Sequence, residues 1–89
     1  MPLQRADYDQ AARYLRYACE LLKRADTRRT GIIREVLGQA IHRLSPGDHF
    51  IGDAAVEITV LRDIATKVPS DDARTEILKA VAVLRDRSS

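Results

Sequence analysis

The sequence has few of the residues that usually anchor a fold or build a catalytic centre. Its 89 residues include one cysteine, no tryptophan and four aromatic side chains, namely Tyr8, Tyr14, Tyr17 and Phe50. The single cysteine, Cys19, excludes an internal disulfide and leaves a cysteine-based metal site without its ligands. The core therefore has to be built from Leu, Ile, Val and Ala.

Long apolar runs are also missing. No stretch approaches the ~20 apolar residues that a membrane span requires, and the first ten residues, MPLQRADYDQ, hold no run of signal-peptide length. We therefore expect a cytoplasmic protein that does not associate with a membrane. The length predicts a single helical domain over residues 1–89. Because a core of this size is often stabilised by oligomerisation, we also expect a homo-oligomer such as a homodimer.

The apolar residues recur at alternating steps of four and three, which is typical of the seam of a helical bundle. In the first predicted helix this seam is formed by Ala11, Leu15, Ala18, Leu22 and Ala25. In the third it is formed by Ala54, Ile58, Leu61, Ala65 and Val68. The pattern predicts an all-α fold, a four-helix antiparallel bundle with helices at about residues 8–25, 28–44, 54–68 and 71–87.

Capping residues support three of the four predicted helix starts. Asp7, Asp53 and Ser70 each precede an apolar-periodic segment, and such side chains accept hydrogen bonds from free backbone N–H groups. The start of the second helix is ambiguous, because either Thr27 or Thr30 could cap it. The cluster at residues 45–48 predicts the turn after the second helix.

No catalytic, metal or cofactor motif stands out. His42 lies on the polar side of its helix and is interpreted as a surface residue. His49 stands between Asp48 and Asp53, but no second histidine or cysteine is adjacent, so turn and cap chemistry is the preferred interpretation. No serine, histidine and acid follow a known nucleophile pattern, and the glycines are too dispersed for a phosphate loop. We therefore expect neither an enzyme nor a bound cofactor or metal.

Two single residues have alternative interpretations. Glu57 falls inside an apolar stripe, so it is either a buried carboxylate with a raised pKa or a first-turn acid satisfied by solvent, the helix dipole or an arginine. The second interpretation is preferred, because acids are common in first turns. Cys19 is interpreted as a small buried hydrophobe rather than a reactive thiol, because no base is near it in the sequence.

One face of the first helix is the main candidate for a binding surface. Arg13, Tyr17, Glu20 and Arg24 are spaced by four, three and four residues and so share a face away from the seam; Arg28 and Arg29 extend the positive charge. A tyrosine between arginines is typical of protein interfaces, and it also suits base stacking beside phosphate contacts. The alternative is an ordinary solvated face, with Glu20 paired to a neighbouring arginine.

A second candidate surface lies on the last helix. Leu78 and Ala82 lie off its seam on one side and Val83 on the other, so its apolar arc is wider than one core needs. We expect these three residues to support self-association.

The two halves of the chain differ in charge. Residues 1–44 carry a net charge of +4 and residues 45–89 a net charge of −2. Twelve of the fifteen basic residues are arginine, which indicates a GC-rich bacterial or phage genome.

We predict a small protein-interaction module (an adaptor, inhibitor or regulator) that binds another protein. Nucleic-acid or nucleotide binding through the arginines is the alternative, disfavoured because acids are interleaved throughout and a helix opening with Asp71 and Asp72 would repel phosphates.

Overall fold

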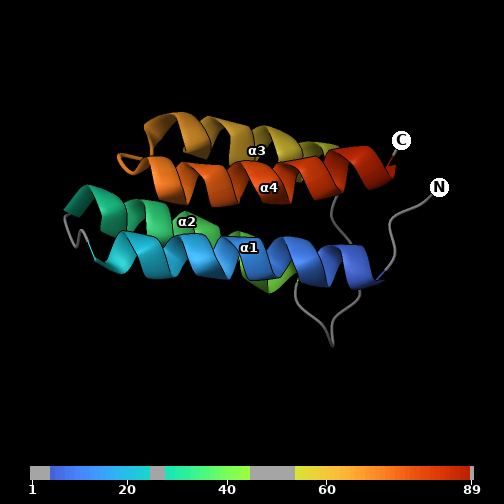
Figure 1. The fold of residues 1–89 in the computed structure, drawn as a ribbon, viewed down its shortest axis with the longest axis horizontal. Coiled ribbons are helices and arrows are strands. Elements are labelled where there is room, and N and C mark those ends of the chain that lie inside the picture. Colours follow the sequence, from blue (N-terminus) through green and yellow to red (C-terminus); the bar gives the residue numbers. More distant parts are fainter. Residues whose placement is uncertain (1–4, 25–27, 45–53, 89) are drawn as a thin grey trace.

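The computed structural model describes residues 5–24, 28–44 and 54–88, and almost all of them are helical. The helices are α1 (Arg5–Lys23), α2 (Arg28–Leu44), α3 (Ala54–Lys67) and α4 (Asp71–Ser88). Successive helices run in opposite directions (Figure 1). The predicted all-α antiparallel bundle is therefore confirmed.

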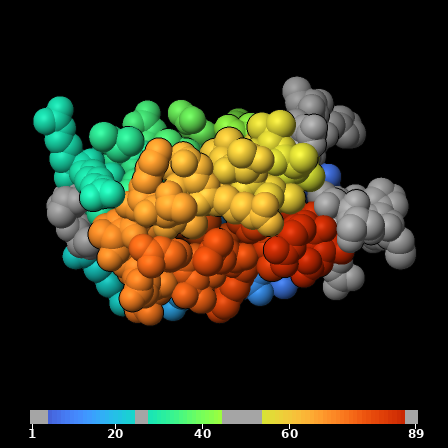
Figure 2. Space-filling view, turned by 90° about the horizontal axis from the view of Figure 1, so that it is seen from above, coloured from blue at the N-terminus to red at the C-terminus, as the bar shows by residue number. Residues whose placement is uncertain are grey.

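The four helices do not contact one another equally. α1 packs against both α2 and α4, and α3 packs against α4, whereas few residues of α2 approach α3. Seen from the α3 side, α3 and α4 cover most of the surface, with α2 along one edge (Figure 2). The Cα radius of gyration is 12.2 Å, close to the ~12 Å expected of a compact chain of this length.

The core consists of aliphatic and alanine side chains and includes most of the two predicted seams, although Ala54 and Ile58 of the third-helix seam are only partly buried. The buried apolar residues are Ala11, Ala12, Leu15, Ala18, Leu22, Ile33, Leu37, Ala40, Leu44, Leu61, Ile64, Ala65, Val68, Ala73, Ile77, Ala80, Val81 and Leu84. Tyr8 and Tyr14 pack against this cluster from its edge and are only partly buried. The described part of the core therefore depends on aliphatic packing.

α1 begins three residues earlier than predicted. It starts at Arg5, so Asp7 lies within the first turn, and its assignment as the N-cap is wrong. An acid within the first turn is still favoured by the helix dipole, which explains why Asp7 does not stop the helix. The Arg5 side chain lies 3.6 Å from Asp9, one turn ahead, and this pair supports the extra residues.

The other boundaries agree to within about two residues. α2 begins at Arg28, so Thr30 lies inside the helix, where it is fully buried and does not act as the cap. Ala25, Thr27, the turn at residues 45–48, His49 and the Asp53 cap lie outside the described residues.

A small hydrogen-bonded corner joins α3 to α4. The backbone N–H of Ala73 donates to Ser70 Oγ at 3.3 Å, which confirms Ser70 as the N-cap of α4. Arg74 donates from Nε to the Ala65 carbonyl oxygen at 3.0 Å and from Nη2 to the Val68 carbonyl oxygen at 2.7 Å. These carbonyls lie at the end of α3, where a cation is favoured, so α4 caps the helix that precedes it.

Among the described residues, no helix combines the length and the apolar character that crossing a membrane requires.

Candidate interaction surfaces

The predicted binding residues are all exposed, and we call them together the Arg/Tyr surface: Arg13, Tyr17, Glu20, Arg24, Arg28 and Arg29. The first three lie on α1, Arg24 directly follows it, and Arg28 and Arg29 open α2 at the same end of the bundle (Figure 1). All six are exposed, and the first turn of α2 (turquoise) projects from that end in Figure 2. Tyr17 is 56% exposed although it is a large side chain.

Few charges on this surface are paired. Glu20 accepts a hydrogen bond from Lys23 Nζ at 3.0 Å, and this contact replaces the predicted pairing with an arginine. Arg13, Arg24, Arg28 and Arg29 form no ion pair with any described residue. The local charge is therefore strongly positive and free to act on a partner.

A groove of about 340 Å³ runs beside Tyr17, between α1 and α4. One wall of the groove consists of Tyr17 and Leu21 on α1 and of Arg24, which directly follows α1. The opposite wall consists of Asp72, Thr75 and Glu76 on α4. The residues of the α4 wall were not predicted from the sequence. Helical spacing shows which residues share a face, but it does not show which two helices are neighbours.

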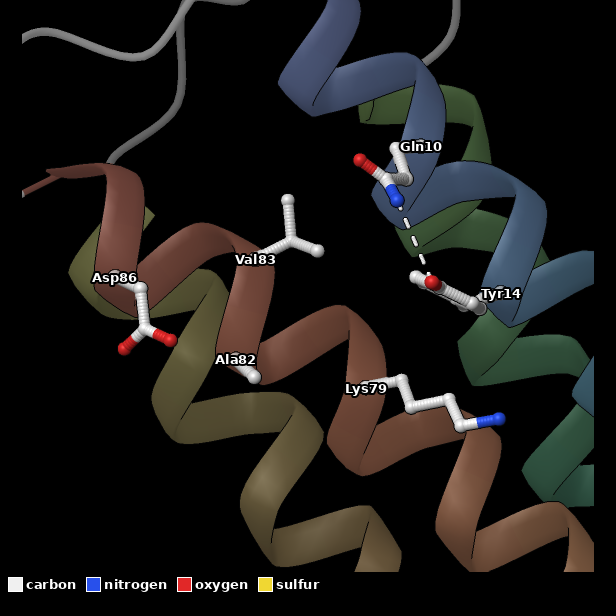
Figure 3. Close-up of a pocket in the computed structure, with 6 residues that line it drawn as sticks. All are labelled: Gln10, Tyr14, Lys79, Ala82, Val83 and Asp86. Atoms are coloured by element: carbon white, nitrogen blue, oxygen red, sulfur yellow. Dashed lines mark hydrogen bonds between the residues drawn. The ribbon is translucent and has the colours of Figure 1, made fainter.

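A second groove of about 330 Å³ lies further along the same helix pair (Figure 3). Gln10 and Tyr14 approach it from α1; Gln10 Nε2 donates to the Tyr14 hydroxyl at 3.3 Å. Lys79 Nζ lies 5.8 Å from the centre of the Tyr14 ring, within the range of a cation–π contact. Lys79 also pairs with Glu76 at 3.1 Å, which links the two grooves.

The predicted self-association residues divide between two places. Ala82 and Val83 line the second groove together with Lys79 and Asp86 (Figure 3). Leu78 is 44% exposed and does not line either of the two grooves described here. Ala82 and Val83 are partly buried, so Leu78 is the most exposed of the three.

Glu57 combines features of both interpretations. It is buried, with only 4% of its side chain exposed, but it also has a partner in α2. Arg43 donates from Nε to Glu57 Oε1 at 2.6 Å and from Nη2 to Oε2 at 3.1 Å. The hydrogen bond to Glu57 raises the pKa of Arg43, so this guanidinium stays charged. Glu57 therefore bridges two helices that otherwise have few contacts.

The remaining reactive side chains are dispersed. His42 is exposed, as predicted. Cys19 is half-buried, and burial raises the pKa of its thiol, partly offset by the charges of Arg34 and Lys23. Within residues 5–24, 28–44 and 54–88, no three His, Cys, Asp or Glu side chains come together as a metal site.

Comparisons with known proteins give no relatives: no family model, curated protein or solved structure matches the chain.

Proposed function

We propose that this protein is a small non-enzymatic interaction module, an adaptor, inhibitor or regulator that binds another protein in the cytoplasm through the Arg/Tyr surface. The observation that carries this proposal is Tyr17, a 56% exposed aromatic side chain at the edge of a groove. Tyrosine and arginine supply large contact areas and directional hydrogen bonds, and both are enriched among the residues that dominate binding energy.

The α4 wall of the groove weighs against nucleic-acid binding, the alternative function. Asp72 and Glu76 line the groove opposite Tyr17 and Arg24. A nucleic-acid strand stacked on Tyr17 would bring its phosphates close to these carboxylates, whose charge repels them. A protein partner does not carry a negative charge at every residue, so it can bind without placing one beside Asp72 and Glu76.

A pull-down from the native host, read by mass spectrometry, tests the proposal. We expect the double variant Tyr17→Ala/Arg24→Ala to lose partners that the unchanged protein retains. The matched control is Val56→Ala/Arg62→Ala on α3, which removes a 55% exposed apolar side chain and an exposed arginine. Circular dichroism establishes that both variants fold. Identical partner sets for both variants would exclude the Arg/Tyr surface as the binding site.

Self-association is the second part of the proposal. Leu78, Ala82 and Val83 expose apolar surface on α4, and a second copy would remove it from water. Light scattering on the unchanged chain should give twice the mass of one chain. The variants Leu78→Asp and Val83→Asp should each return the mass toward that of one chain if their site lies in the interface. A single-chain mass at all concentrations would contradict this part.

A further inference from the structure

Charge pairing differs between the Arg/Tyr surface and the rest of the bundle. Six basic side chains elsewhere in the bundle have acidic neighbours within 4.0 Å, in the pairs Arg5–Asp9, Arg43–Glu57, Lys67–Asp63, Arg74–Asp71, Lys79–Glu76 and Arg85–Asp86. Arg13, Arg24, Arg28 and Arg29 have none among the described residues. Arg62 is also exposed and forms no ion pair with a described residue, but it lies on α3, a helix that does not contact α1. Unpaired charge of one sign is therefore concentrated on this surface.

The groove beside Tyr17 restricts the partner in two further ways, one for each of its walls. Its α1 side offers the Tyr17 ring and the partly buried Leu21, which suit an apolar side chain of a partner. Its α4 side holds Glu76, already paired with Lys79, and Asp72, which forms no ion pair with a described residue. A partner therefore gains most by placing one hydrogen-bond donor or cation opposite Asp72.

The spacing of the arginines sets the size of the partner. Arg13 and Arg24 are eleven residues apart, which corresponds to about 16 Å along a helix axis. Three turns of a partner helix, or about five residues of extended chain, cover this distance. A single carboxylate ion is too small to reach both.

We propose that the Arg/Tyr surface docks an acidic protein segment, in which several Asp or Glu side chains face Arg13, Arg24, Arg28 and Arg29 and one apolar side chain enters the groove between Tyr17 and Leu21. The inference rests on the proposed function and adds the chemistry of the partner. Charge complementarity supports it, because each guanidinium can bind a carboxylate through two parallel hydrogen bonds. The electrostatic attraction also speeds association and makes it sensitive to salt.

Selection from a displayed library of random 16-residue peptides tests the inference with the full chain as bait. Binders are sorted by whether they also bind the Tyr17→Ala/Arg24→Ala variant. We expect the binders lost with this variant to be enriched in Asp and Glu around one large apolar residue. Their affinity should fall about tenfold for Arg24→Glu/Arg28→Glu, and it should stay unchanged for the control Arg62→Glu.

The outcomes separate this inference from the proposed function. Surface-dependent binders that are neutral or basic would overturn the acidic segment and leave the interaction surface intact. A library that yields no binder dependent on Tyr17 and Arg24 would contradict both. A random single-stranded 20-mer DNA serves as a parallel probe. If it binds the Arg/Tyr surface more tightly than the selected peptides, nucleic acid replaces the acidic segment as the ligand.

Discussion

The α1–α4 pair and the α2–α3 pair are both antiparallel neighbours in the bundle, but they are held together in different ways. α1 and α4 pack closely, and fully buried alanines lie on both helices, at Ala11 and Ala18 on α1 and at Ala73 and Ala80 on α4. α2 and α3 have few contacts and are joined by the Arg43–Glu57 ion pair. Small side chains let helix axes approach each other, which agrees with the close packing of α1 and α4.

This difference indicates where the bundle opens first. Burial of apolar side chains is non-directional and is distributed along the whole α1–α4 interface. A bidentate ion pair is directional and localised, and its loss leaves a buried charge without a partner. We therefore expect the α2–α3 side to have the lower local stability.

The largest expected effect is on the α1–α4 side. Leu15 is fully buried on α1, and Leu15→Ala should lower the free energy of unfolding by about 2–5 kcal/mol through lost burial and a residual cavity. Urea denaturation followed by circular dichroism measures this loss. Val56→Ala, at a 55% exposed site, should change the same quantity by less than about 0.5 kcal/mol. Equal losses for both variants would contradict the assignment of the core.

The second effect concerns the ion pair between α2 and α3. Arg43→Ala leaves the Glu57 carboxylate buried without its donor and should cost about 1–3 kcal/mol of unfolding free energy. We expect less than for a fully buried pair, because 40% of the Arg43 side chain is exposed and water can enter. Hydrogen exchange should accelerate in α2 and α3 more than in α1 and α4.

Two variants sharpen this second test. Arg43→Leu/Glu57→Leu replaces both charges by apolar side chains and should recover most of the lost stability. Lys67→Ala breaks the exposed Lys67–Asp63 pair of α3 and should change unfolding by less than about 0.5 kcal/mol. Uniform acceleration of exchange in all four helices would show that the two sides do not open separately.

The smallest effect is the pH dependence that arises from Cys19 on α1. Burial raises the pKa of this thiol in the folded chain, so the folded state keeps a proton that the unfolded state releases. Below the ordinary thiol pKa of about 8.5, both states keep the proton and Cys19 does not make stability depend on pH. As the pH rises above that value, the unfolded state loses the proton first, so the free energy of unfolding falls. Urea denaturation at pH 7, 8, 9 and 10 should give a smaller decrease for Cys19→Ala than for the unchanged chain. Identical decreases for the two proteins would contradict the contribution of the thiol.

The fold was largely predictable because its cause is local. Positions such as Leu15, Leu22 and Leu61 are buried as the four-three stepping predicts, since helical periodicity alone places them on one face. The N-terminal boundary of α1 was less predictable. Asp7 is compatible with both the cap and the first turn, and the choice between them depends on the residues before it.

The candidate surface was only half predictable. The exposure of Tyr17 and its arginine neighbours follows from the spacing within one helix. Asp72 and Glu76 come from a helix about fifty residues later in the chain. No periodicity argument brings them opposite Tyr17, because the pairing of helices depends on how all four seams fit together.

The sequence by itself therefore determined that this chain forms four amphipathic helices, which faces of α1 and α3 turn most of their apolar residues to the core, and that a basic, tyrosine-bearing face stays exposed. These properties depend on spacing and polarity within single helices. Only the tertiary structure decided that α1 lies against α4, that Arg43 satisfies the buried Glu57, and that acids face Tyr17 across a groove. Such contacts join distant segments, and they form because the packing of small and large side chains selects one arrangement of the helices.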